Sequence, residues 1–98
     1  MIVEIQCIPE PAGTTDGPFA RVHAAIQVIE VSGLAYEVGP CGTSIEGTPE
    51  QLWPLLQRIH EATLAAGASS CLSVIKVFQQ TGEAQATMTS LTDRYREQ

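Results

Sequence analysis

Residues 32–47 have the sequence SGLAYEVGPCGTSIEG, and this stretch decides the fold. Apolar side chains alternate with other residues along its first half, which predicts a strand over residues 34–38. The Gly-Pro-Cys-Gly run at residues 39–42 is typical of a tight turn. A short alternating segment at residues 43–46 predicts a second strand, so the whole stretch is expected to form a β-hairpin.

The residues before the hairpin predict a strand followed by a helix. Residues 2–8 alternate with period two, and we expect Pro9 and Pro11 to end this strand. Asp16 or Gly17 is a suitable helix cap, followed by proline in the first turn. The apolar residues of this helix recur at helical spacing and form one stripe: Phe19, Val22, Ile26 and Ile29.

The residues after the hairpin predict a second helix, a fourth strand and a short final helix. Thr48-Pro-Glu-Gln51 has the form of a capping box, and the helix that it opens is expected to stop at Gly67. Pro54 is awkward in this helix, so its first turn is irregular or the helix begins later. Residues 70–78 predict a strand, and the 3-4 spacing of Met88, Leu91 and Tyr95 predicts a C-terminal helix.

Strand-helix-strand occurs twice in this order, which favours one α+β architecture. Each helix is long enough to carry the chain across a sheet and back. Two such units joined by the hairpin give a ferredoxin-like βαββαβ sandwich, with a four-stranded antiparallel sheet and two helices on one face. We therefore expect residues 1–98 to form a single ferredoxin-like domain with a short C-terminal helix.

The sheet face away from the helices has an unusual predicted composition. It combines polar and charged groups with the apolar residues Leu72, Val74 and Phe78. The polar members are Glu4, Gln6, Ser44, Glu46 and Lys76. This mixture favours stacking of two such faces between subunits; the alternative is a solvated face with lysine paired to a glutamate.

Composition limits the possible partners. The net charge is −6 with only five basic residues, which disfavours nucleic acid and anionic membranes. The three cysteines have wide spacings and predict reduced thiols, with Cys7 and Cys71 as small core residues. No signal-peptide pattern or long apolar run is recognisable, so we expect a cytoplasmic protein.

Familiar catalytic patterns are missing from the sequence. There is no phosphate-binding glycine loop, no nucleophile elbow and no zinc spacing, and His23 and His60 are expected on helix surfaces. Glu4, Glu37 and Glu46 could converge near the sheet, for acid–base work or for binding a cation or an aminopyrimidine. Trp53 is expected to pack at the core edge or to stack on a flat ligand.

The hairpin stretch resembles the YkoF-like thiamine-binding family of small ferredoxin-like proteins. The similarity extends to His60-Glu61 followed by Gly67 and covers about residues 2–96. It implies oligomers built by packing sheets, a dimer or a tetramer, that bind thiamine or its hydroxymethylpyrimidine part without chemistry. Together with the residue pattern, it predicts no cofactor, metal or catalytic residue and these ligand-binding residues: Glu4, Gln6, Tyr36, Glu37, Thr43, Ser44, Glu46 and Lys76.

Two other functions remain open at this stage. A small ferredoxin-like isomerase would need a cation facing a pocket, and on the sheet only Lys76 qualifies. A purely structural or regulatory subunit would use the sheet face for assembly alone.

Overall fold

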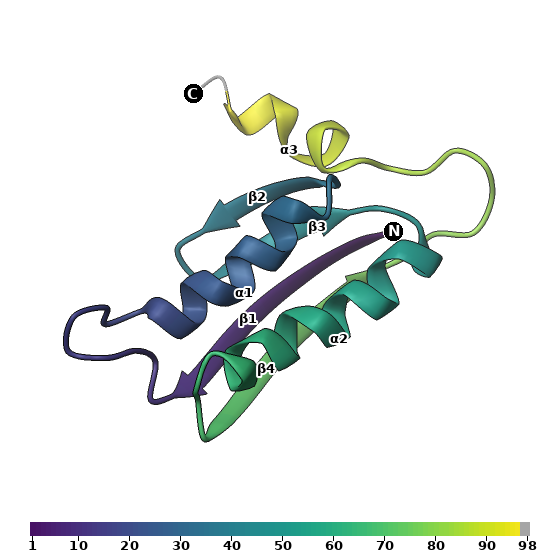
Figure 1. Cartoon of the computed structure of the whole chain (residues 1–98). Helices are drawn as coiled ribbons and strands as arrows, with labels where there is room; N and C mark the ends of the chain where they lie inside the picture. The colour runs from purple at the N-terminus through teal and green to yellow at the C-terminus, as the bar shows by residue number, and fades with distance from the viewer. Residues whose placement is uncertain (97–98) are drawn as a thin grey trace.

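The computed structural model describes residues 1–96 and has one four-stranded antiparallel sheet with the strand order β2-β3-β1-β4 (Figure 1). Helices α1 and α2 pack side by side on one face of this sheet. The predicted ferredoxin-like α+β fold is therefore confirmed. The elements are β1 (Ile2–Glu10), α1 (Ala20–Val31), β2 (Ala35–Gly39), β3 (Gly42–Glu46), α2 (Pro49–Ala65), β4 (Ser70–Phe78) and α3 (Met88–Arg96).

The core lies between the sheet and these two helices. In the central strands, Val3 lies opposite Ile45 and Ile5 lies opposite Thr43, so all four side chains point toward the helices. The buried cluster joins Met1, Val3, Ile5, Ala25, Ile29, Ile45, Leu52, Leu55, Leu56 and Ile59. Burial of these side chains in one contiguous layer is the main favourable contribution to folding.

Strand β1 is longer than its sequence predicted. It continues through Pro9 to Glu10 and pairs with β4 along its whole length, whereas β3 pairs only with Ile2–Ile5. Beyond Ile5 one edge of β1 therefore has no neighbouring strand within residues 1–96. The expectation that Pro9 ends the strand was wrong, because a proline is tolerated where its missing N–H faces an open edge.

Helix α1 begins later than expected. Its N-cap is Phe19, which makes no capping hydrogen bond through its side chain and is 60% exposed. Gly17 lies two residues before this cap, where its amide donates to the Thr14 Oγ1 at 3.1 Å and its carbonyl accepts from the Ala20 amide at 3.1 Å. The predicted cap at Asp16 or Gly17 was wrong because local turn bonding in the loop competes with helix initiation.

Helix α2 begins at the predicted capping box. The Gln51 amide donates to Thr48 Oγ1 at 3.2 Å, and the Thr48 amide donates to Gln51 Oε1 at 2.9 Å. Pro54 lies inside the regular helix on an exposed position. The expectation of an irregular first turn or a later start was therefore wrong. Trp53 is 53% exposed, and the expected packing at the core edge is at most partial.

Candidate functional site

Six of the eight predicted ligand-binding residues lie together on the side of the sheet that α1 and α2 leave uncovered, called here the open face. Strand register places them there, since Glu4 is directly opposite Ser44 and Lys76, and Glu37 is opposite Ser44. Side chains on adjacent strands at such positions lie within contact distance. The six residues are Glu4, Gln6, Glu37, Ser44, Glu46 and Lys76.

Lys76 pairs with a glutamate, as one of the two interpretations of this face required. Its Nζ lies 3.6 Å from Glu4 Oε1, and the two side chains are 79% and 41% exposed. An ion pair with this exposure is screened by water and salt and contributes little to stability. The pair leaves both groups accessible to a ligand or a second subunit.

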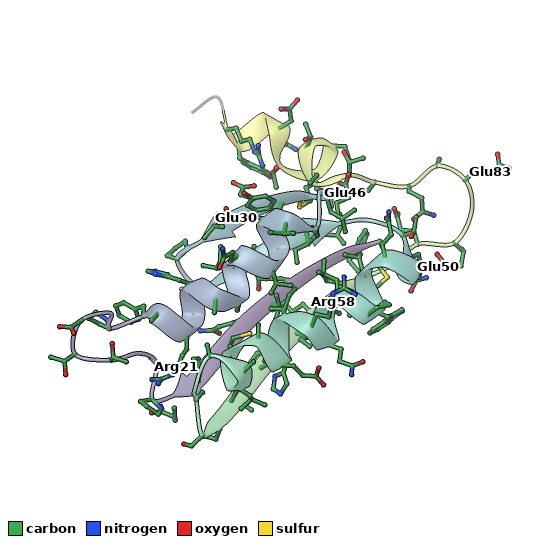
Figure 2. The ribbon with its side chains drawn as sticks, in the orientation of Figure 1. Arg21, Glu30, Glu46, Glu50, Arg58 and Glu83 are labelled. Atoms are coloured by element: carbon green, nitrogen blue, oxygen red, sulfur yellow. The ribbon has the colours of Figure 1, made fainter. Side chains whose placement is uncertain are left out.

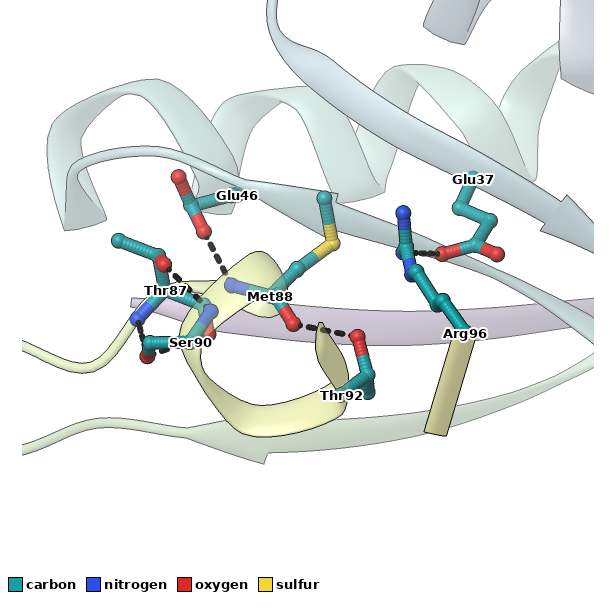
Figure 3. Close-up of polar contacts among 7 residues, drawn as sticks. All are labelled: Glu37, Glu46, Thr87, Met88, Ser90, Thr92 and Arg96. Carbon is teal, nitrogen blue, oxygen red and sulfur yellow. Dashed lines mark hydrogen bonds and ion pairs between the residues drawn. The ribbon is translucent and has the colours of Figure 1, made fainter. Parts of the chain in front are cut away.

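The other two carboxylates of the open face hold helix α3 (Figure 3). Glu46 Oε1 accepts a hydrogen bond from the Met88 amide at 2.6 Å, and Glu37 forms an ion pair with Arg96. Because both glutamates belong to the open face, α3 lies on the side opposite α1 and α2. Figure 2 shows Glu46 beside the start of α3. The three carboxylates share a face, but each has its own partner instead of meeting at one point.

The remaining two predicted residues, Tyr36 and Thr43, point to the helix side of the sheet. Tyr36 lies opposite Ile45 and is 40% exposed, whereas Thr43 is buried opposite Ile5. The sheet therefore separates these two side chains from the six on the open face. A ligand that contacted both groups would have to reach around the end of the sheet.

A cleft lies at that end of the sheet, between the last residues of β1, helix α1 and the β2–β3 turn. Its volume is about 380 Å³, within the range of small-molecule sites. Thr43 lines it from the helix side and Gln6 borders it from the open face. This β1-end cleft is further lined by Cys7, Pro9, Phe19, Val22, Ile26, Val38 and Gly42, among others.

Glu4 stands close to the same cleft. A Cβ added to Gly42, which lines the cleft, would lie 3.1 Å from Glu4 Cγ and 3.2 Å from Glu4 Cδ. The acidic side chain therefore packs over the glycine that starts β3. The cleft thus combines an apolar interior with a carboxylate packed against one of its lining residues.

Arg21 holds the loop that forms one wall of the β1-end cleft. Its Nε donates to the Ala66 carbonyl at 3.2 Å, and its Nη1 donates to the Gly13 carbonyl at 2.8 Å. Figure 2 shows Arg21 at the end of the molecule where β1 finishes. These bonds attach the loop of residues 11–18 to α1 and to the end of α2, so specific contacts hold this wall of the cleft in place.

Sequence reasoning missed the apolar lining of this cleft. Val22 and Ile26 were assigned to the core stripe of α1, but both are half-buried and face the cleft. The only signal was the difference in length between strand 2–8 and strand 43–46, which leaves one edge of the longer strand without a partner.

A second polar cluster lies between α2 and β4. His60 Nδ1 is 2.5 Å from Ser73 Oγ, whose hydroxyl lies 3.5 Å from Cys7 Sγ and 3.8 Å from Cys71 Sγ. His60 was expected on a helix surface, and both cysteines in the core; all three are half-buried. Burial raises the pKa of the Cys7 thiol, which keeps it protonated and a weak nucleophile.

Two negative findings concern residues 1–96. Within this range no three His, Cys, Asp or Glu side chains lie close enough to hold a metal ion. None of the three helices in the same range is long and apolar enough to cross a bilayer.

These features define a small ferredoxin-like protein with a ligand-sized cleft at one end of its sheet. The chain belongs to the thiamine-binding protein family, whose family model matches residues 3–96. The suspected resemblance is therefore confirmed over nearly the whole chain.

Individual relatives agree with this assignment. The UPF0045 protein CPE1503 of Clostridium perfringens is 31% identical over 75 residues, covering 76% of this chain and 77% of the relative. A DUF77 domain of unknown function from Bacillus cereus has a TM-score of 0.86 at 27% identity, covering 98% of this chain and 89% of that one. A Thermotoga maritima protein provisionally assigned to thiamine biosynthesis or salvage shares the fold, with a TM-score of 0.81 at 23% identity and 97% coverage of both chains.

Proposed function

We propose that this protein binds thiamine or its hydroxymethylpyrimidine part and carries out no chemistry on it. The observation that supports this most is the β1-end cleft of about 380 Å³, with its apolar interior and with Glu4 packed against Gly42 of its lining. Small-molecule sites are typically concave and apolar with a few polar groups that orient the ligand. Membership of the thiamine-binding family points to the same class of ligand.

The charge of the site suits a cationic ligand. Glu4 lies beside the cleft, and Glu37 and Glu46 lie on the same open face. The chain has a net charge of −6, so the long-range field also attracts cations. The thiazolium ring of thiamine carries one positive charge, and a nearby carboxylate would offset it.

We further propose that two open faces stack in a dimer or a tetramer, which places the ligand near a subunit interface. The chain exposes 6379 Å², whereas a folded monomer of 10.5 kDa exposes about 5,400 Å². Part of the excess is apolar and lies on this face: Leu72, Val74 and Phe78 are 64%, 46% and 43% exposed. Patches of this kind mark interaction surfaces.

Helix α3 also favours assembly. Its apolar residues Leu91 and Tyr95 are 49% and 60% exposed, although the helix lies on the open face. Its attachment includes the two polar contacts with Glu46 and Glu37. A second subunit on this face would cover the apolar residues of α3 together with those of β4. The proposal places this oligomer in the cytoplasm, and the three free cysteines support a reducing compartment.

A thermal-shift titration with thiamine, its phosphates and hydroxymethylpyrimidine tests the binding proposal. A ligand at 100 times its dissociation constant stabilises the native state by about 2.7 kcal/mol, which raises Tm by several degrees. Glu4→Gln should reduce the shift for thiamine, whereas Glu83→Gln in the distant loop should leave it unchanged. No shift at millimolar concentrations of any of these compounds would contradict the proposal.

Lys76 separates this proposal from its two alternatives. If the protein were an isomerase, turnover of a small organic acid would appear in a substrate screen and would depend on Lys76. If the protein were a purely structural subunit, thiamine would cause no thermal shift, and Lys76→Glu would change the oligomer size seen by light scattering and nothing else. Our proposal requires a saturable shift with no turnover.

A further inference from the structure

The β1-end cleft contains a stretch of strand edge that no other strand of the described part of the chain covers. Strand β1 pairs with β4 from Ile2 to Glu10, but β3 pairs with β1 only as far as Ile5. The next residues of β1, including Cys7 and Pro9, line the cleft. Their backbone groups on this side therefore have no strand partner among the described residues.

The direction of these backbone groups follows from one hydrogen bond. The Met1 carbonyl accepts from the Gly47 amide at 3.1 Å, in register with the β1–β3 ladder, so Met1 and every second residue after it direct their backbone groups toward the β3 side. Successive residues of a strand direct their N–H and C=O groups to opposite edges. Pro9 and Cys7 therefore point to the open edge. Since proline has no N–H, Cys7 alone offers both a donor and an acceptor there.

The surroundings of Cys7 suit a flat apolar body. Val22 and Ile26 from α1 lie on one side of the cleft, and Val38 from β2 lies on another. Phe19, which is 60% exposed, lines the same cleft and could cover a bound ring. A planar ring between these side chains would bring its edge to the backbone of β1.

We propose that the N–H and C=O of Cys7 recognise the edge of a flat heteroaromatic ring on which a ring nitrogen acceptor stands next to an amino donor. Aminopyrimidines have this pattern, with the two groups side by side and pointing the same way. The N–H of Cys7 donates to the ring nitrogen, and its C=O accepts from the amino group. This inference rests on the proposed function and assigns the pyrimidine to the β1-end cleft, with the charged ring of thiamine toward Glu4.

Backbone recognition makes the amino group a determinant of specificity. An analogue that lacks this group leaves the Cys7 carbonyl unpaired in a partly buried site. A lost buried hydrogen bond of this kind reduces affinity by about tenfold or more. The charge of the thiazolium has no part in this step, so hydroxymethylpyrimidine alone should show the full effect.

The first experiment compares hydroxymethylpyrimidine with the analogue that lacks its ring amino group, titrated into isotope-labelled protein and followed by NMR. We expect a large shift of the Cys7 amide resonance with hydroxymethylpyrimidine, and binding at least about tenfold weaker for the analogue. Equal affinities would overturn the inference. So would resonance changes confined to the open face, for example at Ser44 and Lys76, with Cys7 unmoved.

A cleft-filling variant provides an independent test. Val38 is 50% exposed and lines the cleft, so Val38→Phe should occupy the ring site without strain in the core and weaken binding at least about tenfold. Val31→Phe, at a position 80% exposed and outside the cleft, is the matched control. Unchanged binding by Val38→Phe would overturn the inference. If thiamine binds but the Cys7 amide resonance does not move and Val38→Phe binds normally, only this inference fails. If no compound binds, the proposed function fails as well.

Discussion

Replacing Gly42 with alanine tests why a glycine must follow the β2–β3 turn. Gly42 has a φ of +154°, in a strand conformation that residues with a side chain rarely adopt. An added Cβ would lie 3.1 Å and 3.2 Å from Glu4 Cγ and Cδ, closer than the usual 3.5–4.0 Å separation of carbon atoms. We expect backbone strain and crowding together to lower the free energy of unfolding by about 2–4 kcal/mol.

The assay is urea denaturation followed by far-UV circular dichroism, with two further variants. Gly33→Ala is the control for backbone strain alone, because Gly33 has a φ of +77° and a Cβ there would have nothing within 4 Å. Its loss should be about 1–2 kcal/mol. In a Glu4→Ala background the crowding atoms are gone, so Gly42→Ala should be less destabilising there by about 1 kcal/mol.

The double-mutant cycle also shows how this reasoning could fail. If Gly42→Ala has the same effect with glutamate and with alanine at position 4, the close approach of Glu4 is not the reason for the glycine. Loss of the ion pair between Glu4 and Lys76 does not obscure the result, since an exposed pair contributes little.

Three further predictions follow from single contacts. Thr48→Ala removes the capping box of α2 and should lower stability by about 1 kcal/mol, whereas Thr48→Ser should retain most of it; equal losses in urea melts would count against the cap. Glu46→Ala removes the acceptor of the Met88 amide, so this amide should exchange with deuterium faster while the core amides keep their protection; unchanged exchange would show that α3 is held by other means. Exposed Cys41 should react with iodoacetamide well before Cys7, whose pKa is raised by burial, and equal labelling rates would refute this. Because the pKa of the Cys7 thiol is lower in the unfolded chain, the thiol loses its proton first in that state, and the free energy of unfolding should fall as the pH rises into the alkaline range. The same alkaline profile in the wild-type protein and in Cys7→Ala would refute this second expectation.

Strand faces and the α2 cap could be predicted because they depend on neighbours in sequence. Period-two alternation placed Val3 and Ile45 on the helix side and Glu4 on the open face, and the structure agrees. The capping box from Thr48 to Gln51 is likewise a local pattern, and both of its bonds form. Such signals need no knowledge of the tertiary structure.

The end of β1 and the β1-end cleft could not be predicted, because they depend on which strand lies beside which residue. Whether Pro9 ends a strand is decided by the reach of β3, which stops pairing at Ile5. The same difference in strand length turns part of the α1 stripe, including Val22, from core lining into cleft lining. The partners of Glu46 and Glu37 could not be predicted either, since they lie in a helix 42 and 59 residues later in the chain.

Pro9 has a consequence for what the cleft can admit. An open strand edge normally invites another extended chain to add to the sheet, through donors and acceptors that repeat along it. Here the repeat is interrupted after one residue, because Pro9 presents a carbonyl and no N–H on that edge. An extended peptide could form both backbone hydrogen bonds at Cys7 but would lack a donor at Pro9. A ligand one ring wide needs only the two groups of Cys7. If the cleft binds a flat ring as proposed, Pro9 explains how this edge can accept a small compound while disfavouring the addition of another strand.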